Sequence, residues 1–428
     1  MKSTAKCYPN LREYIETITI IDCHDHSGEE RIKYTDAILA LTSGYFHDDI
    51  ASAAGETDRW MLEDLSIPLE ERWPVFERAW KRTKYTGYGL VTRMVMKAFY
   101  GEDELTLESL MRIQEKLLDF SDETLAESIL DKAGISVRIV DSWPDVKKIA
   151  DGSYQMPPRA RLAISIPAYH AICSYEEVQT LMAPLNRTVT SLDEYLQDCR
   201  EIFEVQKAFG AVCFKDQSAY NHHIGYSNPT RSQAEESFNW MISDPRRRLS
   251  YPDGNRLLGD YLFHEFMRMA REMDLPVQLH TGHMAGTWND IRKTRAIHLL
   301  PVLELHREVR FDLFHLNWPY ASDILFLGKN FPNVAIDFCW AHIIDPVYAQ
   351  RIIPQILGAV PHGKIHGYGS DHLGHVDRSW AHSQIARDNI ALGLAEMVEM
   401  DYIGLEDAKE IAQAWLFDNP NQFFKLGF

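Results

Sequence analysis

The sequence lacks the features of a small secreted protein or a membrane protein. Its six cysteines include no CxxC pair, so they do not suggest a disulfide framework, and they favour a reducing compartment. No run approaches the ~20 apolar residues of a membrane span. The N-terminal stretch MKSTAKCYPNLREY has no apolar segment suited to a signal peptide. We therefore expect a cytoplasmic protein that does not bind membranes.

An excess of positive charge is also missing. Asp and Glu outnumber Lys and Arg by 62 to 44, which gives a net charge of −18. Nucleic acids are bound by clustered Lys and Arg, so this balance argues against a nucleic-acid partner. The one dense basic run, Arg246-Arg247-Arg248, follows Asp244-Pro245 and is interpreted as an exposed loop. Apolar residues make up 45% of the chain and charged residues 25%, as in ordinary globular proteins.

Short apolar runs rich in β-branched residues recur along the chain, with longer helical patterns between them. This alternation predicts βα units and a parallel sheet. Eight such runs fit a closed (β/α)8 barrel, or TIM barrel, better than an open doubly wound sheet. No GxGxxG motif follows a strand to indicate a dinucleotide fold. The predicted strands are residues 17–23, 135–140, 163–167, 211–215, 276–280, 309–315, 333–338 and 364–370.

Two segments are longer than simple crossovers. Residues from about 29 to 133 are helical in character and predict a helical insertion after the first strand, packed over the barrel mouth. A smaller insertion of about 225–256 follows the fourth strand. The length of 428 residues would ordinarily suggest two or three domains. Barrels with insertions exceed about 400 residues as one domain, so we expect a single domain over 1–428.

Side chains able to bind metals occupy the ends of five predicted strands, where the active sites of such barrels lie. The first strand runs into His24-Asp25-His26, and because positions i and i+2 face the same side, both imidazoles can face one metal. A single histidine at a strand end is more often structural, so the prediction of a metal site rests on the whole set. Its members are His24, His26, Lys215, His280, His315 and Asp371.

With these residues in these places, the sequence resembles the amidohydrolase superfamily from about residue 18 to the C-terminus. In related members a strand-four lysine is carboxylated and bridges two metals, and the resemblance implies the same for Lys215. A lysine buried beside metals would lose its proton, and the neutral amine can add carbon dioxide to become an anionic bridge. The alternative is a salt bridge from Lys215 to Asp216 or Asp371. With two metals, the deeper one would be held by His24, His26 and Asp371, and the outer one by His280 and His315.

Imidazole and carboxylate ligands suit zinc best, with manganese, iron or nickel as alternatives. A metal lowers the pKa of bound water to about 7, which makes hydroxide available at neutral pH. Asp371 is the expected catalytic residue, because it can take the proton and deliver it to the leaving group. We therefore expect a metal-dependent hydrolase acting on an amide, lactone or ester of a small substrate, carboxylated or like a sugar acid.

Loop residues beside the ligands are the candidates for substrate binding. A carboxylate or phosphate could pair with Arg295, although an exposed surface arginine is the simpler interpretation. Trp318 and Trp340 could stack on a ring, or could pack at the barrel rim. The predicted substrate-binding residues are Tyr220, His283, Arg295, Trp318 and Trp340.

The insertion after the first strand, the segment LTSGYFHDD and the closing DNPNQFFKL resemble the uronate isomerase branch of the superfamily. By resemblance, those enzymes interconvert aldose and ketose sugar acids and typically lack a strand-four lysine ligand. Lys215 therefore favours hydrolysis, and isomerisation is the main alternative. A decarboxylase and a non-catalytic metal-binding barrel rank below it. The expected partner is a small-molecule substrate, and pairing through outer helices would make a homo-oligomer.

Overall fold

The computed structural model describes residues 5–26 and 32–428. Residues 1–4 of the N-terminal stretch and residues 29–31 of the predicted insertion lie outside them. The chain forms two compact units. Unit 1 contains Met1–Arg138, Ala285–Asn289 and Phe338–Asn419, and unit 2 contains Ile139–Met284, Asp290–Asp337 and Pro420–Phe428.

Eight strands in the described chain form one sheet whose order, β1 to β8, is the sequence order. This topology is that of a (β/α)8 barrel and confirms the predicted fold. Each observed strand overlaps its predicted run. The strands are β1 Ile20–Asp25, β2 Ile135–Ser142, β3 Ala160–Ser165, β4 Cys213–Asp216, β5 Val277–Leu279, β6 Phe311–Leu313, β7 Val334–Asp337 and β8 Ile365–His366.

In unit 1 the first strand bonds to the segment that follows the last strand, since the Cys23 N–H donates to the Tyr368 carbonyl at 3.1 Å. The last strand is shorter than predicted because the backbone after it finds other partners. The Gly367 N–H donates to the Trp415 carbonyl at 2.8 Å. A Cβ on Gly369 would lie 2.8 Å from the Cβ of Cys339, so only glycine allows this approach.

In unit 2 the strands β3 to β7 are parallel, and their side chains alternate between two environments. Phe214 of β4 points toward the helices, where its ring meets that of Phe203, with ring centroids 5.3 Å apart. Other positions carry polar side chains that bond across the sheet. Gln278 donates to the Asp312 carboxylate at 3.2 Å and lies 3.5 Å from the Cys213 thiol. This buried polar row is unlike the branched apolar residues that usually fill such barrels.

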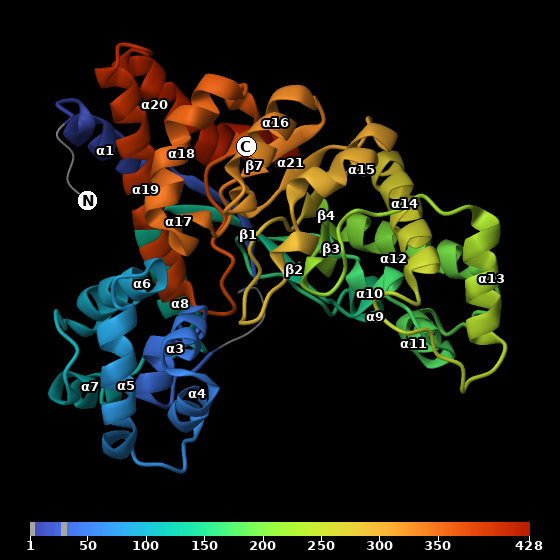
Figure 1. Cartoon of the computed structure of the whole chain (residues 1–428), viewed down its shortest axis with the longest axis horizontal. Coiled ribbons are helices and arrows are strands. Elements are labelled where there is room, and N and C mark those ends of the chain that lie inside the picture. The colour runs from blue at the N-terminus through green and yellow to red at the C-terminus, as the bar shows by residue number, and fades with distance from the viewer. Residues whose placement is uncertain (1–4, 27–31) are drawn as a thin grey trace. The chain divides into compact units, whose positions relative to one another are not determined.

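The predicted insertion after β1 is helical, and its helices lie together in the blue-to-teal part of unit 1 (Figure 1). Asp36 begins α2 by accepting from the Leu39 N–H at 3.0 Å. The same carboxylate pairs with the buried Arg72 of α5. The helices of this region are α2 Ala37–Thr42, α3 Phe46–Ala54, α4 Glu56–Glu63, α5 Leu69–Thr83, α6 Gly87–Val95, η1 Met96–Tyr100, α7 Leu107–Gln114 and α8 Glu123–Ala133.

The remaining helices of unit 1 precede β1 or follow β7 and β8. They are α1 Tyr8–Thr17, α17 Ala341–Ile344, α18 Pro346–Ala359, η7 His362–Lys364, α19 Val376–Glu399, α20 Leu405–Gln413 and η8 Ala414–Asp418. The last helix, α21 Asn419–Phe424, begins at the boundary with unit 2.

Unit 2 carries the helices between β2 and β7, and the predicted second insertion contains α13 beside α14 (Figure 1). The basic run Arg246–Arg248 is exposed, as predicted. The helices are α9 Val146–Ala150, α10 Pro167–His170, α11 Tyr175–Met182, η2 Ala183–Leu185, α12 Leu192–Phe209, η3 Ser218–Tyr220, α13 Arg231–Ile242, α14 Arg256–Glu272, η4 Ile291–Lys293, η5 Ala296–Leu299, α15 Leu300–Leu305, η6 His315–Asn317 and α16 Ala321–Asn330.

Two predictions from composition can be compared with the structure. The cysteines of the described chain are all free thiols. Among residues 5–26 and 32–428, no helix is both long enough and apolar enough to cross a bilayer.

Candidate metal centre

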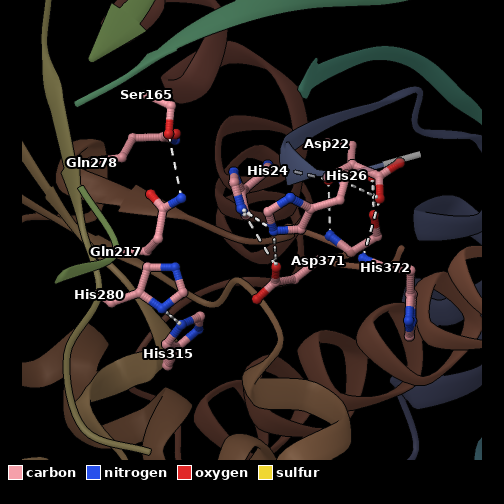
Figure 2. Close-up of polar contacts among 12 residues, drawn as sticks. Asp22, His24, His26, Ser165, Gln217, Gln278, His280, His315, Asp371 and His372 are labelled. Carbon is pink, nitrogen blue, oxygen red and sulfur yellow. Dashed lines mark hydrogen bonds and ion pairs between the residues drawn. The ribbon is translucent and has the colours of Figure 1, made fainter. Parts of the chain in front are cut away.

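Three of the predicted ligands converge in unit 1. Nε2 of His24 lies 3.1 Å from Nε2 of His26, and these two nitrogens lie 3.4 and 3.1 Å from Oδ1 of Asp371. Figure 2 shows both imidazole rings directed at the same carboxylate oxygen. His24 and Asp371 are buried, whereas His26 is partly exposed. Strand β1 therefore presents both histidines to the residue that follows β8.

The spacing of these three atoms suits a shared cation. Ligand atoms at about 2.0–2.1 Å from a tetrahedral ion lie roughly 3.3–3.4 Å from one another. The three observed separations of 3.1, 3.1 and 3.4 Å are close to that value. The donor set of two imidazoles and one carboxylate is also one that zinc accepts. The residues present therefore fit a metal ion.

Hydrogen bonds between the ends of β1 and β8 fix Asp371 in place. Its N–H donates to the His24 carbonyl at 2.8 Å, and its own carbonyl accepts from the Tyr45 hydroxyl. The preceding residue is held as well, because the Asp22 carboxylate accepts from the N–H of Ser370 at 2.8 Å and from the Ser370 hydroxyl at 2.5 Å. Asp371 has a φ of 56°, a conformation that non-glycine residues adopt rarely and mostly where surrounding contacts impose it.

Asp25, between the two histidines, organises the same region from the other face of β1. Its carboxylate accepts from the N–H groups of His26 at 2.9 Å and His372 at 3.1 Å. It also pairs with the guanidinium of Arg138 in β2 at 2.9 Å, and both charged groups are buried. This ion pair therefore helps to fix the position of the backbone that bears His26.

Burial and neighbouring charges shift the pKa values of the acids in this group. Burial alone raises the pKa of Asp371, but the hydrogen bonds and charges of His24 and His26 outweigh it and hold this pKa well below its usual range. The pKa of Asp22 lies well above its usual range, because it is buried and close to the charge of Asp25. The arrangement therefore keeps Asp371 ionised, as a metal ligand must be.

The other predicted ligands gather in unit 2. Nε2 of His315 lies 3.0 Å from Nδ1 of His280. Figure 2 shows the two rings facing each other. Both rings lie next to Phe314, with centroids 5.4 and 5.6 Å from its ring. Nζ of Lys215 lies over the same ring, 3.9 Å from its centroid, and the lysine side chain is fully buried. One aromatic ring thus borders all three predicted ligands.

The end of β4, which carries Lys215, is held by the next residue. The Asp216 carboxylate accepts from the Ser218 N–H at 3.1 Å, the Ser218 hydroxyl at 2.5 Å and the Tyr226 hydroxyl at 2.5 Å. It also lies 3.2 Å from Nε2 of His170. Burial raises the pKa of Asp216, but these partners outweigh it and lower the value to about 2.

Four predicted substrate-binding residues lie in unit 2. The Tyr220 ring lies 5.7 Å from that of His280 and is partly exposed. The ring of His283 meets that of Trp318 edge-on at 5.5 Å, and its N–H donates to the Trp318 carbonyl at 2.9 Å. Arg295 forms a two-point ion pair with Asp323 at 2.9 and 3.0 Å. Their roles in substrate binding stay predictions.

The fifth, Trp340, lies in unit 1 and is buried. Its indole contacts the rings of Tyr45 at 4.4 Å and Tyr88 at 6.1 Å between centroids. These contacts pack Trp340 against two aromatic rings of the insertion. Whether Trp340 also borders a bound substrate stays a prediction.

Sequence reasoning missed several residues that position the ligands. Tyr45 had no visible signal, because nothing in the sequence places an insertion residue beside the end of the last strand. Arg138 did have one, since it is the only charged residue in the apolar run ISVRIV. A buried charge in a strand needs a partner of opposite sign, and Asp25 next to the histidine pair was available.

Comparisons with known proteins agree with this picture. A family model described as amidohydrolase matches residues 244–426. The curated protein fluG of Emericella nidulans is 25% identical over 175 residues, which cover 40% of this chain and 20% of that protein. The matched part thus spans about a fifth of the relative.

Two solved structures share the fold. A uronate isomerase from Thermotoga maritima is 13% identical, with a TM-score of 0.80 over 98% of both chains. A proposed metal-dependent hydrolase from Lactobacillus casei is 16% identical, with a TM-score of 0.68 over 97% of both chains. The family model thus matches the C-terminal part of the chain, and the barrel fold is shared with a uronate isomerase and a proposed metal-dependent hydrolase.

Proposed function

We propose that this protein is a metal-dependent hydrolase, and the observation that carries the proposal is the position of Lys215. Its amine lies at the carboxyl end of β4, fully buried, over the ring that also borders His280 and His315. A buried ammonium is costly in free energy, and a lysine that loses its proton becomes a nucleophilic amine. In a (β/α)8 barrel the carboxyl ends of all strands lie at the same end. In this proposal both groups of ligands serve one reaction.

In this proposal the amine of Lys215 adds carbon dioxide and releases one proton, which gives an anionic carbamate able to bridge two cations. His24, His26 and Asp371 would hold one divalent ion, zinc in the first instance, with manganese, iron or nickel as alternatives. His280 and His315 would hold the other. The chemistry that metals supply at such a site is a Lewis acid for a carbonyl or phosphoryl oxygen and a water of lowered pKa.

The protein's own residues would move the proton and orient the substrate. Asp371, whose Oδ1 faces the two histidines, would accept the proton of the attacking water at Oδ2 and pass it to the leaving group. Tyr220, beside His280, and the His283–Trp318 pair would border the substrate. The proposed substrate is an amide, lactone or ester of a small polar compound, carboxylated or like a sugar acid.

Metal content per chain tests this proposal. Protein purified without chelators is analysed by elemental analysis as wild type, as Lys215→Ala and as the matched control Lys409→Ala. Lys409 is a partly exposed lysine of α20 that pairs with Glu406 at 2.8 Å. We expect two metals in wild type and in the control, and one or none in Lys215→Ala. One metal per chain that Lys215→Ala leaves unchanged would contradict the bridged pair.

A second candidate, a uronate-like isomerase, is favoured by the segment LTSGYFHDD. This segment contains Tyr45, which donates to the Asp371 carbonyl, and Asp48, which accepts from the Gly286 N–H at 2.8 Å. An insertion segment that resembles isomerases thus contacts the backbone of a predicted ligand. Aldose–ketose interconversion assays with a panel of uronates decide this candidate, and absence of turnover would remove it.

A further inference from the structure

Ser165 and Gln217 form a polar pair at the carboxyl ends of β3 and β4 that the proposed chemistry does not use. Ser165 is the last residue of β3 and is in register with Lys215 on the neighbouring strand. Gln217 follows Lys215 by two positions. Nε2 of Gln217 donates to Oγ of Ser165 at 3.3 Å. Figure 2 shows the two side chains pointing toward each other. The pair therefore lies next to a predicted metal ligand within unit 2.

This pair keeps unused hydrogen-bonding capacity. Oε1 of Gln217 is buried and has no hydrogen-bond partner in the described part of the chain. Oγ of Ser165, which is 4% exposed, takes part in one hydrogen bond among the described residues, as its acceptor. A buried amide oxygen without a partner is costly in free energy. Such groups persist mainly where a ligand or water completes them.

The backbone that carries the pair is firmly held, as a recognition site requires. The hydrogen bonds from the Ser218 N–H and hydroxyl to the Asp216 carboxylate fix the turn on which Gln217 lies. On the β3 side, the N–H of Ile166 donates to the carbonyl of Lys215 at 3.0 Å. Two residues beyond Ser218, the Tyr220 ring lies 5.7 Å from that of His280. The same loop therefore carries the pair and borders a predicted metal ligand.

We propose that Ser165 and Gln217 are specificity-determining residues that recognise a hydroxyl group of the substrate. A hydroxyl can donate to Oε1 of Gln217 and accept from the Ser165 hydroxyl at the same time, which uses both free capacities. A carboxylate would be repelled by the amide oxygen, and an ammonium group could not accept from the serine. The proposal rests on the hydrolase function above and narrows its substrate to a compound that carries a hydroxyl group.

Calorimetric titration tests this proposal without any turnover. The probes are six-carbon aldonates, each measured beside the analogue that lacks one hydroxyl group, on protein purified without chelators. In wild type, one deoxy analogue is expected to bind about tenfold more weakly than its parent, as the loss of a hydrogen bond to buried groups predicts. In Ser165→Ala and Gln217→Met, that ratio is expected to fall close to one. The control is Gln197→Met, at an exposed position on α12.

The outcomes separate this proposal from the proposed function. A wild-type protein that binds every parent and deoxy analogue equally, or binds none of them, would overturn the assignment of the pair. So would variants that keep the wild-type ratio while their thermal unfolding is unchanged. A discriminating wild type that hydrolyses no substrate would count against the hydrolase alone, because the binding ratio does not depend on catalysis.

Discussion

The hydroxyl of Tyr45 donates to the backbone carbonyl of Asp371, although 326 residues separate them in the chain. Tyr45 belongs to the insertion after β1, and Asp371 follows β8. The Tyr45 ring also lies against Trp340, which follows β7. The insertion thus supports the backbone conformation of a predicted metal ligand.

Replacing Tyr45 by phenylalanine should weaken the site more than the fold. The ring contact with Trp340 is kept, but the Asp371 carbonyl loses a donor, at a cost of about 0.5–1.5 kcal/mol. We expect lower affinity for the metal bound by His24 and His26, measured by competition with a chelator. Tyr85→Phe, at an exposed tyrosine of the same insertion, is the control. Equal metal affinity in both variants would show that the hydrogen bond does not position Asp371.

Arg138→Met should be strongly destabilising, because it leaves the buried carboxylate of Asp25 without its cation. Breaking a buried ion pair on one side typically costs about 3–5 kcal/mol. The double variant Asp25→Asn, Arg138→Met should lose less than the sum of the single changes. Chemical unfolding of wild type, the two single variants and the double variant measures this coupling. A double variant whose loss in free energy of unfolding equals the sum of the two single losses would refute it. Arg246→Met, which removes an exposed pair with Asp244, should leave the unfolding midpoint unchanged.

Gly87→Ala should disturb the contact between α6 and α17. A Cβ at this position would lie 2.0 Å from the carbonyl oxygen of Ile343, so the backbone must shift. We expect a loss of about 1–3 kcal/mol in the free energy of unfolding. Gly358→Ala in α18 is the matched control, since a Cβ there meets no atom within 4 Å. Its expected effect is a small stabilisation of up to about 1 kcal/mol. Similar melting temperatures for the two variants would speak against the close approach.

Stability should fall as the pH drops below about 6.5, partly through two buried histidines of unit 2. Nδ1 of His264 lies 2.8 Å from Nε2 of His306, and Nε2 of His264 lies 2.8 Å from the Ser227 carbonyl. Burial lowers the pKa of both histidines. For His306, burial together with the nearby charges of His264, Arg268 and Arg271 lowers the pKa to about 3. Between pH 6.5 and 3 the unfolded chain therefore binds more protons, so this contribution is complete above pH 6.5 and is lost on acidification.

Thermal unfolding of His306→Gln between pH 7 and 4 measures this effect. The melting temperature of the variant should depend less on pH than that of wild type, because one titrating group has been removed. His362→Gln, at an exposed position, should keep the wild-type slope. Parallel curves for His306→Gln and wild type would mean that other groups cause the acid sensitivity.

The order of the strands followed from the sequence because local composition carries it. Each β-branched run between helical patterns became a strand of the barrel, in sequence order. The first and last residues of the strands did not follow from the sequence. The run from Thr17 begins as the end of α1, and β1 extends through His24 to Asp25. Within the eighth run, the N–H of Gly367 bonds to the Trp415 carbonyl instead of a strand. Hydrogen-bond partners far along the chain set such limits, and residue preferences alone do not reveal them.

For the site, the sequence by itself determined which residue types stand at the strand ends, because position along a parallel strand decides which end of a barrel a side chain reaches. His24, His26 and Asp371 meet in unit 1 as that reasoning predicts, and His280 and His315 meet in unit 2. Only the tertiary structure decided what surrounds them. Tyr45 under Asp371, Arg138 beside Asp25 and the Ser165–Gln217 pair are contacts between segments far apart in the sequence. Such contacts depend on which side chains are buried together and how close they lie in the folded chain. A local sequence pattern encodes neither.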